Sequence, residues 1–213
     1  MKLYNFFRSG TSHRLRIALH LKGLATDYVA VDLRVEEHLK EAFKSLNPQG
    51  LVPALAVNDA QVLIQSPAII EWLEETYPTP ALLPTDANDR AHVRALAAIV
   101  GCDIHPINNL RILKYLRHEL GQSQDAVDTW ARHWISEGFA ALEALADADQ
   151  PFLSGAAPGL AFSTSALTMR PFGPEPLRPA RSAASVGRSG LVAVTLPSAS
   201  SVVVAAPKRT MKR

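Results

Sequence analysis

Residues 3–19 read LYNFFRSGTSHRLRIAL, and the character of this stretch changes at Arg8. The apolar residues before Arg8 are typical of a short buried strand, whereas the apolar positions after Ser12 recur at helical spacing. Ser9, Thr11 and Ser12 place three hydroxyl groups between strand and helix. The first N–H groups of a helix have no intrahelical partner, so hydroxyls beside them make a place that holds an anion. Either a phosphate or a thiolate from a bound peptide fits such a place, and the remaining sequence favours the thiolate.

Strand and helix signals alternate as far as Pro84. Gly23 is expected to end the first helix, and Ser66 is expected to cap a later helix that has Pro67 at its first position. The order βαβαββα predicts an α/β unit with a mixed sheet. The other expected segments are a strand at 27–33, a helix at 38–46, a hairpin of 51–57 and 61–64 around Asn58-Asp59, and a helix from Ser66 to Tyr77.

Prolines between 78 and 84 indicate a linker, and the pattern from Asn88 onward is purely helical. Two long helices separated by residues 121–123 are expected to build an all-α second domain. The expected domains are 1–80, 88–161 and an atypical segment, 162–213. The positions that recur at helical spacing are Val93, Leu96, Ala97, Val100, Ile104 and Ile107 in the first helix, and Val127, Trp130, Ala131, Trp134 and Leu142 in the second.

The composition narrows the class of protein. The 213 residues are 47% hydrophobic, which supports a real core. No apolar run reaches the roughly 18 residues of a transmembrane helix, and the first residues do not resemble a signal peptide. The single cysteine, Cys102, excludes an internal disulfide and fits a reducing cytoplasm. Residues 1–160 carry 14 basic and 19 acidic side chains, a balance that does not indicate a nucleic-acid partner.

Several motifs, in the right order, resemble the zeta class of glutathione transferases. That class includes the maleylacetoacetate and maleylpyruvate isomerases, and the form RSGTSHR at 8–14 is more similar to the bacterial maleylpyruvate isomerases. The match is dense from Met1 to about Ala161. The matching motifs are Phe7-Arg8-Ser9 with the helix that follows, Asn47-Pro48-Gln49, Val52-Pro53-Ala54-Leu55, Gln65 to Leu73, and Cys102-Asp103-Ile104-His105-Pro106-Ile107-Asn108-Asn109.

The resemblance implies a thioredoxin-like α/β domain at 1–80, followed by the all-α domain of glutathione transferases. Redox members of the thioredoxin-like fold carry Cys-x-x-Cys before the first helix. Here the turn is Ser9-Gly10-Thr11-Ser12, so dithiol chemistry is excluded by the absence of sulfur. The implied cofactor is glutathione, and no metal site is expected.

The resemblance also implies residues that bind glutathione. Gln65 and Ser66 would hold the γ-glutamyl carboxylate at a helix N-terminus, although Ser66 as a simple cap explains the same pattern. Val52 and Pro53, joined by a cis peptide bond, would pair with the ligand backbone. The remaining implied contacts are His38 and His105, as donors to the glycyl carboxylate and the backbone, together with Gly10, Asp103, Asn109 and Arg111.

Ser9 and Thr11 are the candidates for holding the thiolate. A hydrogen bond to a charged acceptor contributes about 1.5–3 kcal/mol, more than the roughly 0.3–1 kcal/mol of a helix N-terminus. The hydroxyl therefore matters more than the helix dipole, and zeta enzymes favour the position of Ser9. Arg8 and Arg111 are the candidates for binding the substrate carboxylate and the developing enolate. Arg111 lies six residues after His105 on the same expected helix, which puts both near one side.

Other basic and thiol side chains receive simpler interpretations. Arg14 and Arg16 are expected to be solvated or salt-bridged residues of the first helix. Cys102 is expected to be a packed thiol, because the family takes its nucleophile from glutathione.

The implied activity is the glutathione-dependent cis–trans isomerisation of maleylpyruvate to fumarylpyruvate in the gentisate branch of aromatic degradation. Thiolate addition, bond rotation and elimination would return glutathione unchanged. A maleylacetoacetate isomerase, a conjugating zeta-class transferase and a non-catalytic glutathione-binding module stay open as alternatives. The class also implies a cytoplasmic homodimer, with no membrane or nucleic-acid partner.

The family pattern stops abruptly. Where the family opens a buried helix with Ser/Thr-x-x-Asp, this chain has Gly159-Leu160-Ala161-Phe162. Losing such a capping box costs about 1–2 kcal/mol. Residues 161–213 carry eight basic side chains and one acidic side chain, and are rich in Ser, Ala and Pro. Arg170, Arg178 and Arg181 match no motif.

Three explanations account for residues 162–213: a disordered tail, a basic nucleic-acid or membrane arm, or a shifted reading frame. The charges are scattered, with no amphipathic face, which argues against an arm. Because every family feature ends together, a shifted frame that truncates the helical domain is favoured. Residues 191–196 and 202–204 are still apolar enough to form strands.

Overall fold

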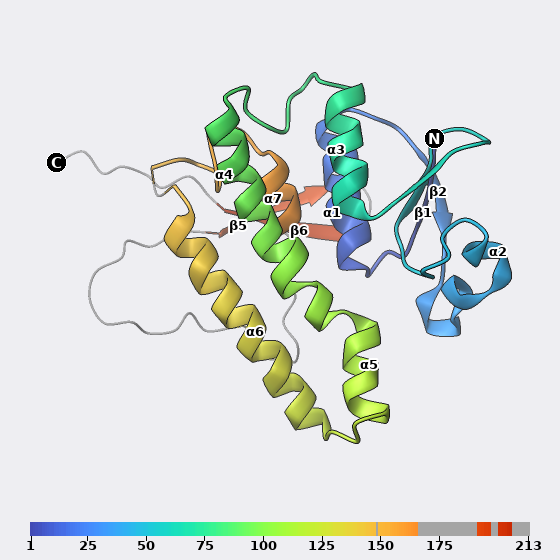
Figure 1. The fold of residues 1–213 in the computed structure, drawn as a ribbon. Helices are drawn as coiled ribbons and strands as arrows, with labels where there is room; N and C mark the ends of the chain where they lie inside the picture. Colours follow the sequence, from blue (N-terminus) through green and yellow to red (C-terminus); the bar gives the residue numbers. More distant parts are fainter. Residues whose placement is uncertain (148, 166–190, 197–199, 206–213) are drawn as a thin grey trace, which may run out of the picture. The chain divides into compact units, whose positions relative to one another are not determined.

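The computed structural model describes residues 1–147, 149–165, 191–196 and 200–205 (Figure 1). The chain divides into two compact units, Met1–Arg90 and Ala91–Arg213. Each unit is described by itself below.

The first unit is built on a four-stranded mixed sheet. Its strands are β1 (Lys2–Asn5), β2 (Asp27–Ala30), β3 (Ala54–Ala56) and β4 (Val62–Ile64), in the spatial order β2-β1-β3-β4. β1 runs parallel to β2 and antiparallel to β3, and β3 and β4 form the expected hairpin. With helices α1, α2 and α3, the order is βαβαββα, which confirms the predicted α/β unit.

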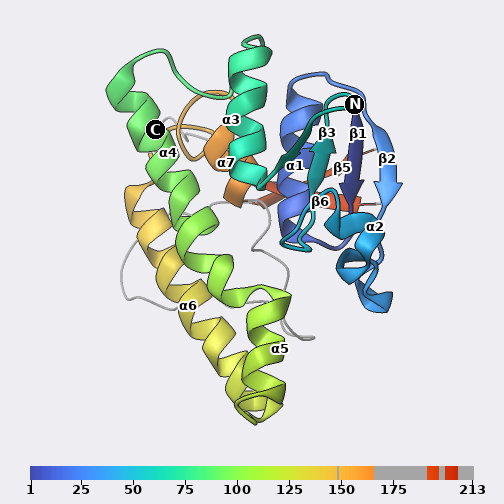
Figure 2. The same cartoon turned by 45° about the vertical axis from the view of Figure 1, so that its right-hand side comes forward.

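Helices cover both faces of this sheet. α1 (Gly10–Leu21) and α3 (Ser66–Thr76) lie together on one side, and the short α2 (Glu41–Lys44) lies on the other (Figure 2). Side chains alternate along a strand, so the paired and fully buried Leu3 and Leu55 face α1 and α3. Tyr4 and Ala54 face the opposite way and pack in a cluster with Phe43 of α2.

Two expected segments are shorter in the structure. The strand predicted at 27–33 ends at Ala30, because the Asp32 carboxylate accepts the Arg34 N–H at 2.9 Å and starts a 3₁₀ turn. The helix predicted at 38–46 is helical only over α2, since a second 3₁₀ turn occupies Glu37–Leu39. The predicted stop at Gly23 is confirmed: its φ is +67° and its N–H donates to the His20 carbonyl.

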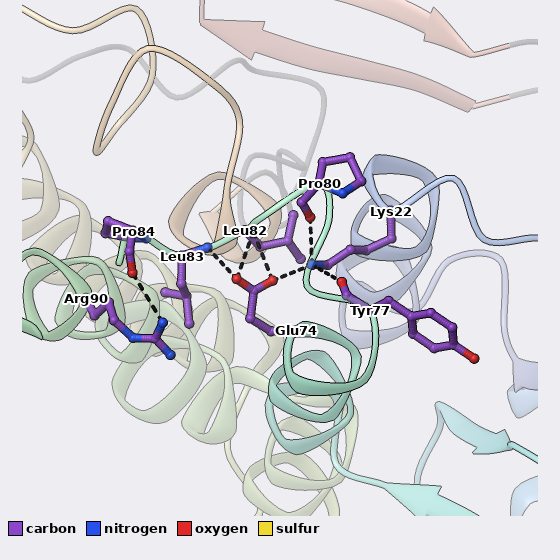
Figure 3. A network of polar contacts seen from close by, with 8 residues as sticks. All are labelled: Lys22, Glu74, Tyr77, Pro80, Leu82, Leu83, Pro84 and Arg90. Atoms are coloured by element: carbon purple, nitrogen blue, oxygen red, sulfur yellow. Dashed lines mark hydrogen bonds and ion pairs between the residues drawn. The ribbon is translucent and has the colours of Figure 1, made fainter. Parts of the chain in front are cut away.

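A buried ion pair ties the C-terminal ends of α1 and α3 to the proline-rich segment after α3 (Figure 3). The Lys22 ammonium, whose side chain is fully buried, bonds the Glu74 carboxylate and donates to the carbonyls of Tyr77 and Pro80, each at 2.7 Å. These three acceptors match the three N–H donors of an ammonium group.

The Glu74 carboxylate is also used on its other side. It accepts the Leu82 N–H at 2.9 and 3.1 Å and the Leu83 N–H at 3.1 Å. Leu82 and Leu83 are themselves buried. The segment predicted as a linker is therefore held in place by charge-assisted hydrogen bonds, because both members of the ion pair, Lys22 and Glu74, bond its backbone.

Lys22→Met is expected to destabilise the first unit strongly, because it leaves the buried Glu74 carboxylate without its cation. Breaking one side of a buried pair costs about 3–5 kcal/mol. Lys44→Met, at an exposed lysine of α2, is the matched control and is expected to cost less than about 0.5 kcal/mol. Urea unfolding, followed by hydrogen exchange of peptides from α1 and α3, measures both. Equal midpoints for the two variants would contradict the assigned role of the pair.

The second unit begins with helices, but the first of them is not continuous. α4 (Ala87–Ala98) begins just before the boundary of the unit and is followed by a π-helical turn, Ile99–Ile104, and a 3₁₀ turn, Pro106–Asn108. A new helix, α5 (Leu110–His118), then begins. The prediction of one long helix is wrong here. Pro106 lacks an N–H, and the Asn109 carboxamide oxygen accepts the N–H groups of Arg111 and Ile112, so the chain restarts instead of continuing.

α6 (Gln124–Leu145) packs against the π-helical turn at close range. A Cβ added at Gly138 would lie 2.3 Å from the buried side chain of Ile104, so any larger residue there requires Ile104 to shift. The buried face of α6 consists of Val127, Ala131, Ile135 and Leu142. Trp134, predicted for that face, is 39% exposed. Trp130 instead lies half-buried, with its indole N–H donating to the Ile107 carbonyl at 3.0 Å.

The described part of the later chain contains α7 (Leu160–Ser165) and a hairpin of β5 (Leu191–Leu196) and β6 (Ser200–Ala205). These strands coincide with the apolar stretches of the sequence. The disorder or frame shift proposed for 162–213, and the unassigned Arg170, Arg178 and Arg181, fall largely or wholly outside the described residues. Among the described residues, no helix is long and apolar enough to cross a membrane.

Candidate functional site

The N-terminus of α1 is capped by Ser9. Its backbone is extended, with φ −70° and ψ 126°, and its hydroxyl oxygen accepts the Ser12 N–H at 3.3 Å. The Ser9 carbonyl accepts the His13 N–H at 3.0 Å. The N–H groups of Gly10 and Thr11 stand at the start of the helix, where no intrahelical acceptor exists. The predicted hydroxyl-rich helix start is therefore present.

A chain of hydroxyl groups connects this helix start to the loop before β3. The Thr11 hydroxyl donates to the Val52 carbonyl at 2.8 Å, and the Ser9 and Thr11 oxygens lie 3.0 Å apart. A carbonyl only accepts, so the single Thr11 hydrogen is used by Val52. Ser9 must then be the donor toward Thr11. The direction of the chain is from Ser9 to Thr11 to Val52.

The loop before β3 carries the predicted cis bond between Val52 and Pro53. Asn47, only 1% exposed, closes this loop: its amide donates to the Leu51 carbonyl at 2.7 Å, and its oxygen accepts the Gln49 N–H at 3.1 Å. β3 lies inside the sheet, so only the residues before its ladder offer backbone groups to a ligand. Within the described part of the chain, the Val52 N–H makes no hydrogen bond.

Gly50 brings this loop against the turn that holds His38. Gly50 has φ +62°, and a Cβ there would lie 2.9 Å from the His38 carbonyl oxygen. His38 itself is half-buried in the 3₁₀ turn Glu37–Leu39. That turn follows Asp32, whose pKa is lowered to about 2, first by the side-chain hydrogen bond from Arg34 and then by the Arg34 backbone N–H. Both partners are at the surface, so this pair orders the loop and adds little stability.

The start of α3 differs from the prediction. Gln65, not Ser66, occupies the cap position, with the left-handed φ of +66° and no capping hydrogen bond from its side chain. Its amide instead donates to the Gln49 side chain at 2.6 Å. Ser66 is the first helical residue and is buried, with 2% exposure. The explanation of Ser66 as a simple cap is therefore wrong, because its hydroxyl accepts from Arg14 at 3.3 Å.

Arg14 is the residue of this region that the sequence interpretation missed. It was expected to be solvated or salt-bridged; its 1% exposure rules out the solvated alternative, and its guanidinium donates to Ser66 of the neighbouring helix. The helical spacing of Arg14 with the buried Ile17 and Ala18 was the available signal. Arg16, by contrast, lies nearer the surface and donates to the Asn5 side chain and the Phe7 carbonyl. Arg8 is exposed beside the helix start.

The other candidates belong to the second unit. His105 is half-buried between the π-helical and 3₁₀ turns, and Asp103 and Arg111 are exposed. Asn109 acts as the cap of α5. The argument that Arg111 and His105 share one helical face is wrong, because the helix is interrupted between them. Cys102, predicted to be packed, is exposed. No group of three or more metal-ligating side chains occurs among the described residues.

Comparison with known proteins places the chain in a family. The model of the glutathione S-transferase N-terminal domain matches residues 8–76. The chain is 70% identical, over 149 residues and 70% of each chain, to a maleylpyruvate isomerase from a Ralstonia species. The chain belongs to the zeta class of the glutathione S-transferases.

Solved structures agree with this family and with its thioredoxin-like and helical domains. A holo structure of maleylpyruvate isomerase, described as a bacterial zeta-class glutathione S-transferase, has a TM-score of 0.76 and 64% identity, and covers 79% of this chain and 80% of that chain. A maleylacetoacetate isomerase from Anaeromyxobacter dehalogenans, with GSH bound in the active site, has a TM-score of 0.69 and 42% identity and covers 78% of each chain.

Gly50→Ala is expected to destabilise this transferase site more than Gly121→Ala. Both glycines have φ +62°, so both substitutions carry the same left-handed strain. Only the Cβ at Gly50 meets an obstacle, since nothing lies within 4 Å of that at Gly121. The clash with backbone should add about 1–3 kcal/mol. Hydrogen exchange of peptides spanning 36–53 measures the loss, and similar protection in both variants would contradict the close approach to His38.

Proposed function

We propose that this zeta-class transferase catalyses the glutathione-dependent cis–trans isomerisation of maleylpyruvate to fumarylpyruvate, a step of gentisate degradation. The observation that carries the proposal is the 70% identity to a maleylpyruvate isomerase. The chain of hydroxyl groups from Ser9 to Val52 supports the proposal. It offers hydrogen-bond donors to a thiolate, and because the site contains no cysteine, the thiolate must come from the bound peptide. Isomerisation of maleylacetoacetate is the nearest second candidate, since a relative with that activity is 42% identical.

The residues of the first unit fit a γ-glutamyl tripeptide. Ser66 stands at the N-terminus of an 11-residue helix, which favours a carboxylate. Gln65 and Gln49 form a polar bridge beside it, and the Val52 N–H is available to a peptide carbonyl. Bound glutathione supplies a thiolate that adds to the cis double bond, permits rotation about the resulting single bond, and leaves again from the trans isomer.

The Ser9 hydroxyl is proposed to donate a hydrogen bond to the thiolate, and the Thr11 hydroxyl to keep Ser9 in position. If Thr11 turned its hydrogen toward sulfur, the carbonyl of the buried Val52 would lose its donor. If Ser9 turns instead, Thr11 keeps its bond to Val52 and loses only an incoming hydrogen bond. The second change leaves no buried group unpaired and therefore costs less. The N–H groups of Gly10 and Thr11 add the field of the helix terminus.

The substrate carboxylates and the developing enolate call for cations. Arg8, exposed beside the helix start, and Arg111, exposed in the second unit, are proposed for these roles. His38, Asp103, His105 and Asn109 are proposed as further glutathione contacts, with Pro53 beside Val52. A cytoplasmic homodimer is proposed on the same family grounds.

An absorbance assay of maleylpyruvate, with and without glutathione, tests the proposed activity. We expect turnover only with glutathione, and faster turnover of maleylpyruvate than of maleylacetoacetate. A chlorinated nitrobenzene as a third substrate tests for conjugation. The outcome that contradicts an isomerase is retention on glutathione resin with no isomerisation of either substrate, which is the result expected of a binding module.

Ser9→Ala is expected to raise the pKa of the bound glutathione thiol by about one to two units, which corresponds to a lost charge-assisted hydrogen bond of about 1.5–3 kcal/mol. Thr11→Val should leave that pKa nearly unchanged and instead destabilise the first unit by about 1 kcal/mol. Ultraviolet absorbance of the thiolate against pH measures the first effect, and urea unfolding measures the second. Ser45→Ala, at an exposed hydroxyl of the same unit, is the control. A larger pKa change in Thr11→Val than in Ser9→Ala would reverse the two assignments.

A further inference from the structure

Arg14 is a buried cation directly behind the start of α3. Its side chain is 1% exposed, and its guanidinium Nη1 lies 3.3 Å from the Ser66 hydroxyl oxygen. Burying a guanidinium costs free energy that a surface position would avoid. A leucine or methionine of similar length would fill the same space between α1 and α3 without that cost. The position therefore calls for an explanation beyond packing.

The direction of the hydrogen bond between Arg14 and Ser66 supplies such an explanation. An arginine donates and never accepts, so Ser66 must accept from Arg14. The Ser66 hydroxyl hydrogen then points away from the guanidinium. Within the part of the chain that the structure describes, this hydrogen has no protein acceptor. A buried hydroxyl hydrogen left in this way is satisfied when a ligand anion accepts it.

We propose that Arg14 is a positioning residue for anion binding at Ser66. It orients the Ser66 hydroxyl as a donor toward the γ-glutamyl carboxylate. The inference rests on the proposed glutathione function and goes beyond it, because Arg14 itself touches no ligand. Ser66 alone, as a hydroxyl free to rotate, would be as ready to accept a hydrogen bond as to donate one. The arginine removes that ambiguity before the ligand arrives.

A merely structural role makes a different prediction. If Arg14 only stabilised the packing of α1 on α3, its loss would lower the unfolding midpoint and weaken all ligands alike. If Arg14 positions Ser66, its loss weakens ligands in proportion to their use of the carboxylate. The decisive quantity is therefore a ratio of affinities and not a single affinity.

The experiment uses isothermal titration calorimetry of the full chain with two probes. One is glutathione, and the other is γ-aminobutyryl-cysteinyl-glycine, which lacks only the carboxylate that Ser66 is proposed to bind. We expect the wild-type protein to prefer glutathione by about tenfold or more, because a charge-assisted hydrogen bond is lost with the analogue. Arg14→Gln and Ser66→Ala should each reduce this preference several-fold. The double variant should reduce it no further than the stronger single variant does.

Arg16→Gln is the matched control, since Arg16 lies on the same helix and bonds Asn5 and Phe7 but not Ser66. It should keep the full preference. Arg14→Lys retains a charge without the planar guanidinium and should give an intermediate preference. It also decides the question if Arg14→Gln does not fold, as judged by circular dichroism.

The outcomes separate the two hypotheses. A wild-type protein that binds neither probe refutes the glutathione site itself. A wild-type protein that prefers glutathione, with Arg14→Lys or Arg14→Gln folded and showing the same preference, overturns the role of Arg14 alone. Unchanged preference in Ser66→Ala likewise removes the hydroxyl on which Arg14 is proposed to act.

Discussion

Two buried contacts fix α1 and α3 against each other, and the geometry of the site depends on them. Arg14 bonds Ser66 near the beginning of the helices, and Lys22 bonds Glu74 near their ends. The partners are 52 residues apart in both contacts, and the contacts are eight residues apart along each helix. Eight residues of helix span about 12 Å. The helices are therefore parallel, and a slip of one residue would break both contacts at once.

The buried charged groups fix the register of α1 against α3. Each basic group would be costly to bury without its partner, so a wrong register is penalised more than it would be between two apolar faces. Because the helices are parallel and in register, their N-termini lie at the same end of the unit. One N-terminus carries Ser9, and the other carries Ser66. The Thr11 hydroxyl adds a third link, from α1 to the loop before β3. Unusual backbone gathers at the same place: Gln65 and Gly50 both have positive φ, as is common where a binding site constrains the chain.

The sequence predicts what local rules decide. The order βαβαββα, the stop at Gly23 and the hairpin follow from periodicity and turn residues. The cis bond before Pro53 follows from the family resemblance. What the sequence misses depends on tertiary neighbours. The residues next to Ser66 in the sequence give no sign that its hydroxyl accepts a hydrogen bond from Arg14, which lies 52 residues earlier. The apolar residues of the sequence keep helical spacing through Pro106, although the backbone there changes to π and 3₁₀ turns. Trp134 has the right spacing for the core but is 39% exposed in the structure.

Helix α7 lies where the sequence departs from the family pattern. α7 forms without the family's capping box. Its first turn uses the Gly159 carbonyl as acceptor for the Ser163 N–H, and the buried hydroxyls of Ser163 and Thr164 bond the Leu160 carbonyl within the same helix. Hydroxyl groups that donate to carbonyls of their own helix have their hydrogen bond made locally, so they do not link the helix to another element. By contrast, among the described residues, the hydrogen bonds that order Ser9, Thr11 and Ser66 are made inside Met1–Arg90. The hydroxyl contacts proposed to hold the thiol, from Ser9 to Thr11 and from Thr11 to Val52, are therefore made by residues that precede the departure from the family pattern.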